Sequence, residues 1–342
     1  MTAPEIRFEP HSPTRRRFIA TTAAMPFLAA CQGLLEAPER GPIAAVFLGR
    51  INDGDYHEQG YRGLQRVRDR LRIPVQSVDR IGSDRASIMS ALREAVQSEA
   101  TMIVVDGAGA SEAVQRVAWE FPRKRFTIIQ GNRLRPNLAI YRMRSEESAW
   151  LAGASAGLLT KSGVVGHAGN GQGADSFDVD IAFAAGVNAT NAKARVIERA
   201  ILDLNDSSAP VRAAWAYVDA GADVLFVTGA ATPAIAAAQR RGVRLIGQGR
   251  DWVAERPDAF VASAVADNGA VIVQVGRDLL DSVWRGDLVR HYGLRYPDIV
   301  RLAAASSLPS DIIATIEGLR GQVASGRIPV RSGPSAGSRS RD

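Results

Sequence analysis

The stretch MIVVDGAGASEAVQRVAWEFPRKRFTIIQ, residues 102–130, decides the fold. It begins with an apolar run at 102–105, passes through a glycine-rich turn into an amphipathic segment at 111–121, and ends in a second apolar run at 126–130. A short buried strand, a helix and another short buried strand in this order form a βαβ unit, whose two strands run parallel. Residues 102–130 therefore predict a parallel sheet covered by helices.

The same alternation continues in both directions along the chain. On the N-terminal side we expect strands at 43–48 and 75–78 and helices at 58–71 and 85–97. On the C-terminal side we expect a helix at 146–159 and strands at 138–141, 164–168, 194–197, 223–227, 243–247 and 260–263. The number of expected strands exceeds what a single sheet usually contains. We therefore expect an α/β protein with two doubly wound parallel-sheet lobes and a hinge between them.

The expected domain boundaries follow from this pattern. We assign 43–142 plus 268–286 to an N-terminal lobe and 146–264 plus 298–328 to a C-terminal lobe. We expect a tether at residues 31–42, and residues 331–342 contain no large apolar side chain, so we expect a disordered tail there.

The first thirty residues have the features of an export signal. Residues 14–19, Thr-Arg-Arg-Arg-Phe-Ile, are a twin-arginine pattern, and an apolar run at 18–30 follows it. The run ends in Leu-Ala-Ala-Cys31, which resembles a lipobox, although an ordinary cleavage site beside an incidental cysteine is the alternative. We expect a bacterial protein that is exported to the periplasmic side of the inner membrane and lipid-anchored through Cys31.

Composition excludes several classes of protein. The chain has 342 residues, of which 46% are hydrophobic and 23% charged, which is typical of a globular protein. One cysteine excludes a disulfide scaffold, and the four histidines lie far apart in sequence, so we expect no metal and no cofactor. The net charge of +6 is spread thinly, and we expect no nucleic-acid partner.

Polar and aromatic residues follow several of the expected strands. Ligands bind at the carboxyl ends of the strands in sheets of this kind, so these residues are candidates for a binding site. Much of the pattern is also what ordinary βα turns contain. Ordinary βα turns do not explain large aromatic residues at loop tips, so these are the stronger candidates. The candidates are Asp53, Asp55, Tyr56, His57, Asp106, Gly107, Gly229, Asp251 and Trp252.

Four blocks of the sequence resemble the basic membrane protein family of bacterial lipoproteins, the purine-nucleoside receptor type. They lie at 53–63, 146–163, 182–188 and 221–226, the last followed by Ile246-Gly247, and the resemblance covers about residues 43–325. The most specific block is Glu146-Glu-Ser-Ala-Trp-Leu-Ala-Gly…Thr-Lys-Ser-Gly163. The resemblance implies a substrate-binding protein of an ABC importer, with a two-lobed, type I periplasmic-binding fold.

The resemblance also implies roles for individual residues. Tyr56 would stack on a purine, and Asp53 and His57 would line the same wall. Asp106 and Gly107 would contact nitrogens of the base. From the second lobe, Phe183 would close the pocket and Gly229 would lie under the ligand.

The sequence departs from the family at the residues that hold ribose. Nucleoside-binding members carry an acid and a lysine at positions that correspond here to Gly249 and to Ala266 or Asp267. Asp-Gly-Asp-Tyr at 53–56 is also more similar to the branch thought to bind free bases. We therefore expect a purine base or a related flat heterocycle in preference to a nucleoside.

The expected function is capture of this small molecule between two closing lobes, followed by delivery to an ABC permease and its ATPase. A ligand-sensing receptor for a sugar or another small molecule would have similar lobes and is the first alternative. An enzyme of doubly wound fold is the second. The sequence has no Walker loop and no His-x-x-x-His pair, and the glycine-rich segment 169–173 lacks the Lys-Ser/Thr of a phosphate loop, so we expect no catalysis.

Overall fold

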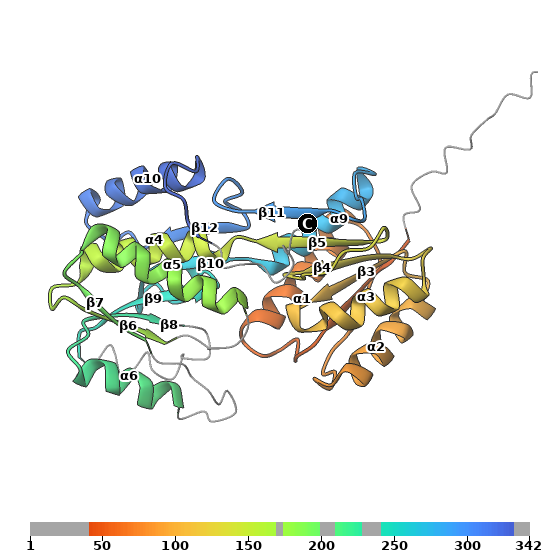
Figure 1. The fold of residues 1–342 in the computed structure, drawn as a ribbon, viewed down its shortest axis with the longest axis horizontal. Helices are drawn as coiled ribbons and strands as arrows, with labels where there is room; N and C mark the ends of the chain where they lie inside the picture. Colours follow the sequence, from red (N-terminus) through yellow and green to blue (C-terminus); the bar gives the residue numbers. More distant parts are fainter. Residues whose placement is uncertain (1–40, 169–173, 199–208, 228–240, 332–342) are drawn as a thin grey trace, which may run out of the picture. The chain divides into compact units, whose positions relative to one another are not determined.

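The computed structural model describes residues 41–168, 174–198, 209–227 and 241–331. Its strands form two separate sheets of six strands each (Figure 1). In the first sheet the order is β11 (Val289–Tyr292), β5 (Leu138–Met143), β4 (Arg125–Ile129), β3 (Met102–Asp106), β1 (Ile43–Phe47) and β2 (Val75–Val78). In the second it is β12 (Val300–Ala304), β10 (Phe260–Ala266), β9 (Arg244–Gly249), β8 (Val224–Val227), β6 (Val164–Ala168) and β7 (Arg195–Glu198).

Helices cover both faces of the first sheet because its strands are apolar on both sides. In β1, Ile43, Ala45 and Phe47 pack into one hydrophobic cluster, and Ala44 and Val46 pack into another. The first cluster includes residues of α1 (Tyr56–Arg66), its π-helical extension η1 (Val67–Leu71) and α9 (Asn268–Leu280). The second includes residues of α2 (Arg85–Gln97) and α3 (Ser111–Glu120), and the short η2 (Ala108–Ala110) leads into α3.

The second sheet is built in the same way. On one face lie α4 (Ser145–Leu159) and α5 (Ala174–Thr190), which pack closely on each other, and α10 (Ser310–Ala324) packs against α4. On the other face lie α6 (Ala209–Asp219) and the short α8 (Trp252–Glu255). Every strand pair within the two sheets is parallel except β10 with β12. The expected α/β fold with two doubly wound, mostly parallel sheets is confirmed.

Two strands were missing from the sequence-based expectation, β11 and β12. Both contain polar residues, Val-Arg-His-Tyr and Val-Arg-Leu-Ala-Ala, because each lies at a sheet edge and is only partly buried. Their period-2 patterns are short and hard to distinguish from a loop. β11 also extends the first sheet beyond residue 286, where we expected its last segment to end, by pairing with β5.

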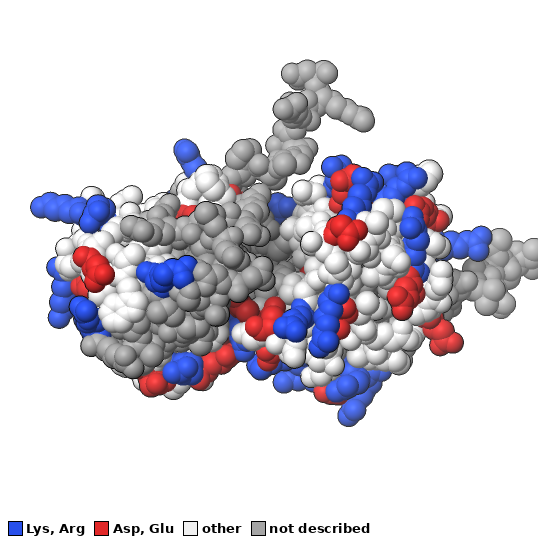
Figure 2. All heavy atoms as spheres, turned by 90° about the horizontal axis from the view of Figure 1, so that it is seen from below, with Lys and Arg blue, Asp and Glu red and all other residues white. Residues whose placement is uncertain are grey.

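Several expectations concern residues outside the described ranges. These are the export signal at 1–30, the tether at 31–40, Cys31, Gly229, the glycine-rich segment 169–173 and the tail from 332. They stay predictions of the sequence. Within the ranges that are described, no helix has the length and apolar character needed to cross a membrane. Basic and acidic side chains are interspersed on the face shown in Figure 2.

Candidate binding site

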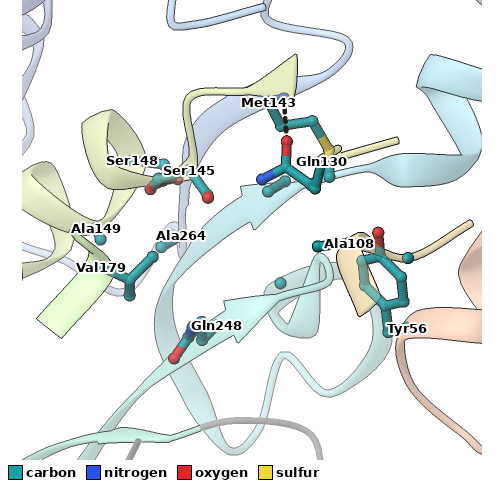
Figure 3. A pocket seen from close by; sticks show the side chains of 13 residues that line it. Tyr56, Ala108, Gln130, Met143, Ser145, Ser148, Ala149, Val179, Gln248 and Ala264 are labelled. Atoms are coloured by element: carbon teal, nitrogen blue, oxygen red, sulfur yellow. Dashed lines mark hydrogen bonds between the residues drawn. The ribbon is translucent and has the colours of Figure 1, made fainter. Parts of the chain in front are cut away.

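A cavity of about 250 Å³ opens where the carboxyl ends of strands from both sheets meet. This is the position at which doubly wound sheets bind ligands. The lining combines one aromatic ring, two side-chain amides, two hydroxyls and several small or apolar groups. The residues are Tyr56, Gly107, Ala108, Gln130, Met143, Ser145, Ser148, Ala149, Val179, Gln248, Gly249, Ala264 and Ala266 (Figure 3). Within the described part of the chain, the lining therefore contains no ionisable acid or base other than the tyrosine phenol.

Tyr56 brings the only aromatic ring among these lining residues. It is the first residue of α1, and its backbone carbonyl oxygen accepts a hydrogen bond of 2.9 Å from Asn268 Nδ2 at the start of α9. Its ring packs edge-on against the imidazole of His57, with centroids 5.4 Å apart. These contacts fix the start of α1, so the Tyr56 ring is presented to the cavity by a rigid element. Among the sequence-based candidates that the structure describes, Tyr56 and Gly107 line the cavity.

Two glutamines supply the amide groups of the lining. Gln130 follows β4 with a φ of 61°, and its Oε1 accepts a hydrogen bond of 2.7 Å from the backbone N–H of Met143. That bond directs the amide nitrogen of Gln130 into the cavity, as Figure 3 shows. Gln248 Oε1 is buried and has no hydrogen-bond partner among the described residues. A buried acceptor without a partner is costly, so this oxygen is suited to an N–H donor from a ligand.

Asp106 does not line the cavity, although we expected it to contact a ligand. Its side chain has no exposed surface, and both carboxylate oxygens accept from Asn268 Nδ2, at 3.1 and 2.9 Å. His57 Nδ1 lies 3.6 Å from Asp106 Oδ2. Burial is the largest single influence and would lower the pKa of His57, but the carboxylates of Asp106, Asp53 and Asp55 together raise that pKa above its ordinary value. Asp106 thus holds α1 and α9 together beneath the site.

Asp53 and Asp55 organise the loop that leads into α1. Asp53 accepts from the backbone N–H groups of Asp55, His57 and Glu58, at 2.8–3.1 Å. Burial, and then the neighbouring Asp53 charge, raise the pKa of Asp55 to about 6. Arg250, which follows β9 in the second sheet, opposes that shift and donates from Nη1 to the Gly54 carbonyl oxygen. The loop at 53–55 is therefore a contact between the halves of the fold that carry the two sheets.

The remaining candidates from the second sheet lie away from the cavity. Phe183 is fully buried and stacks on Phe226, with centroids 4.4 Å apart. Trp252 is 5% exposed, and its Nε1 donates to the Gln248 carbonyl oxygen at 3.1 Å. Asp251 caps α8 and pairs with Arg301 at 2.7 Å. Phe183 and Trp252 face inward because burying their large apolar surfaces is favourable, whatever their position along a loop or helix.

Most residues of the cavity lining were not predicted from the sequence. Gln130 and Gln248 both stand at the carboxyl end of an expected strand, so their position carried a usable signal. Ser145, Ser148 and Val179 lie on helices, where a lining residue has no distinguishing local pattern. Among the described residues, no three His, Cys, Asp or Glu side chains form a group that could hold a metal ion.

Replacing Asp55 by Asn should change how stability depends on pH. The pKa of Asp55 is about 6 in the folded protein and ordinarily 3.8. Because the folded pKa is the higher one, the stabilisation is fully present below pH 3.8 and is lost as the pH rises through about 6. Above that pH we expect Asp55→Asn to be more stable than the wild type by about 1–3 kcal/mol.

Urea unfolding of both proteins across this pH range measures the difference. It should vanish in acid, where the Asp55 carboxyl is neutral in both the folded and unfolded chains. Asp219→Asn, at an exposed position at the end of α6, controls for the substitution itself. A difference between wild type and Asp55→Asn that stays constant with pH would contradict the prediction.

Comparison with known proteins agrees with this architecture. The model of the Bmp family, described as "ABC transporter substrate-binding protein PnrA-like", matches residues 42–332. A purine-binding protein of Brucella abortus (strain 2308) is 21% identical over 304 residues, which cover 88% of this chain and 86% of the relative. Basic membrane protein A2 of Borrelia garinii subsp. bavariensis is 20% identical, with 82% and 85% covered.

Solved structures are similar in fold. An ABC transporter solute-binding protein from Aeropyrum pernix K1 superimposes with a TM-score of 0.72 at 19% identity, covering 84% of this chain and 92% of that one. One from Conexibacter woesei gives 0.69 at 21% identity, with 85% and 99% covered. The family and the fold are those of solute-binding proteins. With the family model matching nearly all of the described residues, the chain belongs to the Bmp family of PnrA-like substrate-binding proteins of ABC transporters.

Proposed function

We propose that this substrate-binding protein captures a purine base, or a closely related uncharged flat heterocycle, in the cavity around Tyr56. The observation that carries the proposal is the chemistry of the lining, which offers an aromatic ring and neutral amides. Transfer of an ion into such a cavity without a charged partner would be strongly unfavourable. A neutral heterocycle matches the lining better than an amino acid or a sugar phosphate does.

The donors and acceptors of the site suit the edge of a base. The buried Gln248 Oε1 can accept from a ring N–H or an exocyclic amine. The Gln130 amide nitrogen can donate to a ring nitrogen or a carbonyl oxygen, because its own oxygen is occupied by Met143 N–H. Each such buried hydrogen bond contributes about 0.5–1.5 kcal/mol, and stacking on Tyr56 contributes about 1–3 kcal/mol.

The size and composition of the cavity favour a base over a nucleoside. A volume of about 250 Å³ is below the range of about 300–1,000 Å³ that accommodates drug-sized ligands. The expected ribose-holding positions are Gly249 and either Ala266 or Asp267. Gly249 and Ala266 belong to the lining and offer no polar side chain, and Asp267 is not among the described lining residues. The purine-binding relative from Brucella abortus supports the purine assignment.

Closure of the two halves around the ligand is the proposed mechanism. The Arg250 hydrogen bond to Gly54 joins the halves beside the cavity, and Arg250 is itself held by Glu255 through bonds of 2.7 and 3.0 Å. A ligand that contacts Tyr56 in one half and Gln248 in the other would stabilise the form in which the two halves are close together. The closed form would then be recognised by the permease and its ATPase.

Thermal unfolding in the presence of candidate ligands tests the proposal. We expect adenine or hypoxanthine at 100 times its dissociation constant to add about 2.7 kcal/mol of stability, which raises the Tm by several degrees. Adenosine and inosine should have a smaller effect, and amino acids none. A response to nucleosides only would overturn the preference for a base. A response to a sugar and to no purine would overturn the ligand class.

Tyr56→Ala provides the specific test of the site. Loss of stacking should weaken purine binding by about 5- to 150-fold, the equivalent of 1–3 kcal/mol, as measured by calorimetry. Tyr56→Phe retains the ring and should bind nearly as well as the wild type. Tyr296→Ala, at a residue that is 50% exposed and lies outside the cavity, is the matched control.

A further inference from the structure

A second and larger cavity, of about 710 Å³, shares no lining residue with the cavity around Tyr56. We call it the arginine groove. Its walls come from α1 with η1, from α9, and from residues 295–301, which lead into β12. Five of its lining residues are arginines and two are aspartates, namely Arg66, Arg70, Arg277, Arg295, Arg301, Asp267 and Asp298.

Two of the five arginines are neutralised by carboxylates. Arg66 Nη2 lies 3.3 Å from Asp267 Oδ1, and Arg301 Nη2 lies 2.7 Å from Asp251 Oδ2. Asp267 is further committed to capping α9, because its Oδ1 accepts from the backbone N–H of Ala270 at 2.8 Å. These pairs fix the positions of Arg66 and Arg301 and leave little acceptor capacity on Asp267.

The other three arginines form no ion pair with a described carboxylate, although the Glu147 carboxylate lies close enough for the Arg295 charge to lower its pKa. Within the described ranges, no carboxylate oxygen lies within 4.0 Å of the guanidinium of Arg70, Arg277 or Arg295. Arg295 Nε donates to the neutral carbonyl oxygen of Ala324, which orients its guanidinium without removing its charge. In the groove wall, Arg66 Nε is buried, and its N–H forms no hydrogen bond within the part of the chain that the structure describes. Three separate segments thus each contribute to the groove an arginine without a carboxylate ion pair, and the described lining contains only Asp298 as a further acid.

Guanidinium groups bind phosphate oxygens through paired, charge-assisted hydrogen bonds. A phosphate group carries enough oxygens and charge to satisfy several guanidinium groups at once. We propose that the arginine groove is a binding site for a phosphate-bearing anion, distinct from the ligand site at Tyr56. Such an anion could be a soluble phosphate compound or the headgroup of an anionic phospholipid, and the chemistry of recognition is the same in both cases.

The test uses the whole protein with two probes. Calorimetry with inorganic pyrophosphate measures binding of a soluble anion. Co-sedimentation with phosphatidylglycerol vesicles, compared with phosphatidylcholine vesicles, measures binding of an anionic headgroup. We expect binding in at least one arm, and we expect it to weaken as salt rises from 0.01 M to 0.15 M, since the Debye length falls from about 30 to 8 Å.

The double variant Arg70→Gln with Arg277→Gln should weaken that binding by at least about tenfold, the effect of losing one charged hydrogen bond. The matched control, Arg85→Gln with Arg320→Gln, removes the same net charge from exposed positions outside the groove. Selective loss in the groove variant supports the proposal, and the arm that responds identifies the source of the phosphate. Equal loss in both variants, or no binding to either probe, would overturn it. The purine response of the groove variant should be unchanged, so this test is independent of the ligand assignment.

Discussion

Replacing Asn268 by Ala should lower the free energy of unfolding by at least about 2–3 kcal/mol. Asn268 has no exposed surface, and its Nδ2 group donates to both carboxylate oxygens of Asp106 and to the carbonyl oxygen of Tyr56. The substitution removes all three interactions and leaves a fully buried carboxylate whose remaining ion-pair partner among the described residues is His57. Leaving a buried charged acceptor without its donor costs more than the hydrogen bond contributes when it is formed.

Urea unfolding at neutral pH measures this effect, and Asn188→Ala is its matched control. Asn188 lies at an exposed position on α5, where Ala is the better helix former, so its stability should change by no more than about 0.5 kcal/mol. A double-mutant cycle with Asp106→Asn separates the pairwise interaction from general loss of packing. A cost below about 1 kcal/mol for Asn268→Ala would mean that the network does not hold α1 to α9.

The second large effect is expected at the crossing of α4 and α5. A Cβ atom at Gly153 would lie 2.0 Å from the Phe183 carbonyl oxygen, and one at Gly186 would lie 2.0 Å from the Trp150 carbonyl oxygen. The two helices therefore pack backbone against backbone, and the obstructing atoms cannot rotate away as a side chain would. We expect Gly153→Ala to destabilise the protein by at least about 1–3 kcal/mol, the usual range for overpacking.

The same substitution at Gly318 is the control for Gly153→Ala. Gly318 lies within α10, and a Cβ atom there would meet no heavy atom within 4 Å. Ala at an exposed helix interior is favoured over Gly by about 0.5–1 kcal/mol, so Gly318→Ala should stabilise the protein. Opposite signs for the two variants in thermal or urea unfolding would support close packing of α4 on α5. A neutral or stabilising Gly153→Ala would contradict it.

Strand and helix positions followed from local patterns. The apolar runs at 102–105 and 126–130 and the amphipathic segment between them correspond to β3, β4 and α3. The helix expected at 146–159 corresponds to α4. These elements were predictable because burial on both faces of a parallel sheet requires continuous apolar runs, and helices between them require a 3.6-residue period. The edge strand β12 was not predictable in the same way, because its antiparallel pairing with β10 depends on a partner distant in sequence.

The candidate site was only partly predictable. Its location at the carboxyl ends of the strands followed from the fold class, and Tyr56 and Gly107 lie there. Adjacent residues at one strand end can nevertheless have different surroundings. Asp106 is fully buried, whereas Gly107 lines the cavity. Asn268, which binds Asp106, was missed because the two residues are 162 positions apart and neither carries a local signal of the contact.

By itself, the sequence determined the class of fold, the order of most elements and the edge at which ligands would bind, because each depends on the period of hydrophobic residues and on turn chemistry. Only the tertiary structure decided which side chains face the cavity. It turned Phe183 and Trp252 inward, placed Gln130 and Gln248 in the lining of one cavity, and gathered Arg70, Arg277 and Arg295 around one groove. Side-chain direction and long-range contact depend on how helices and sheets pack against one another, which no local pattern specifies.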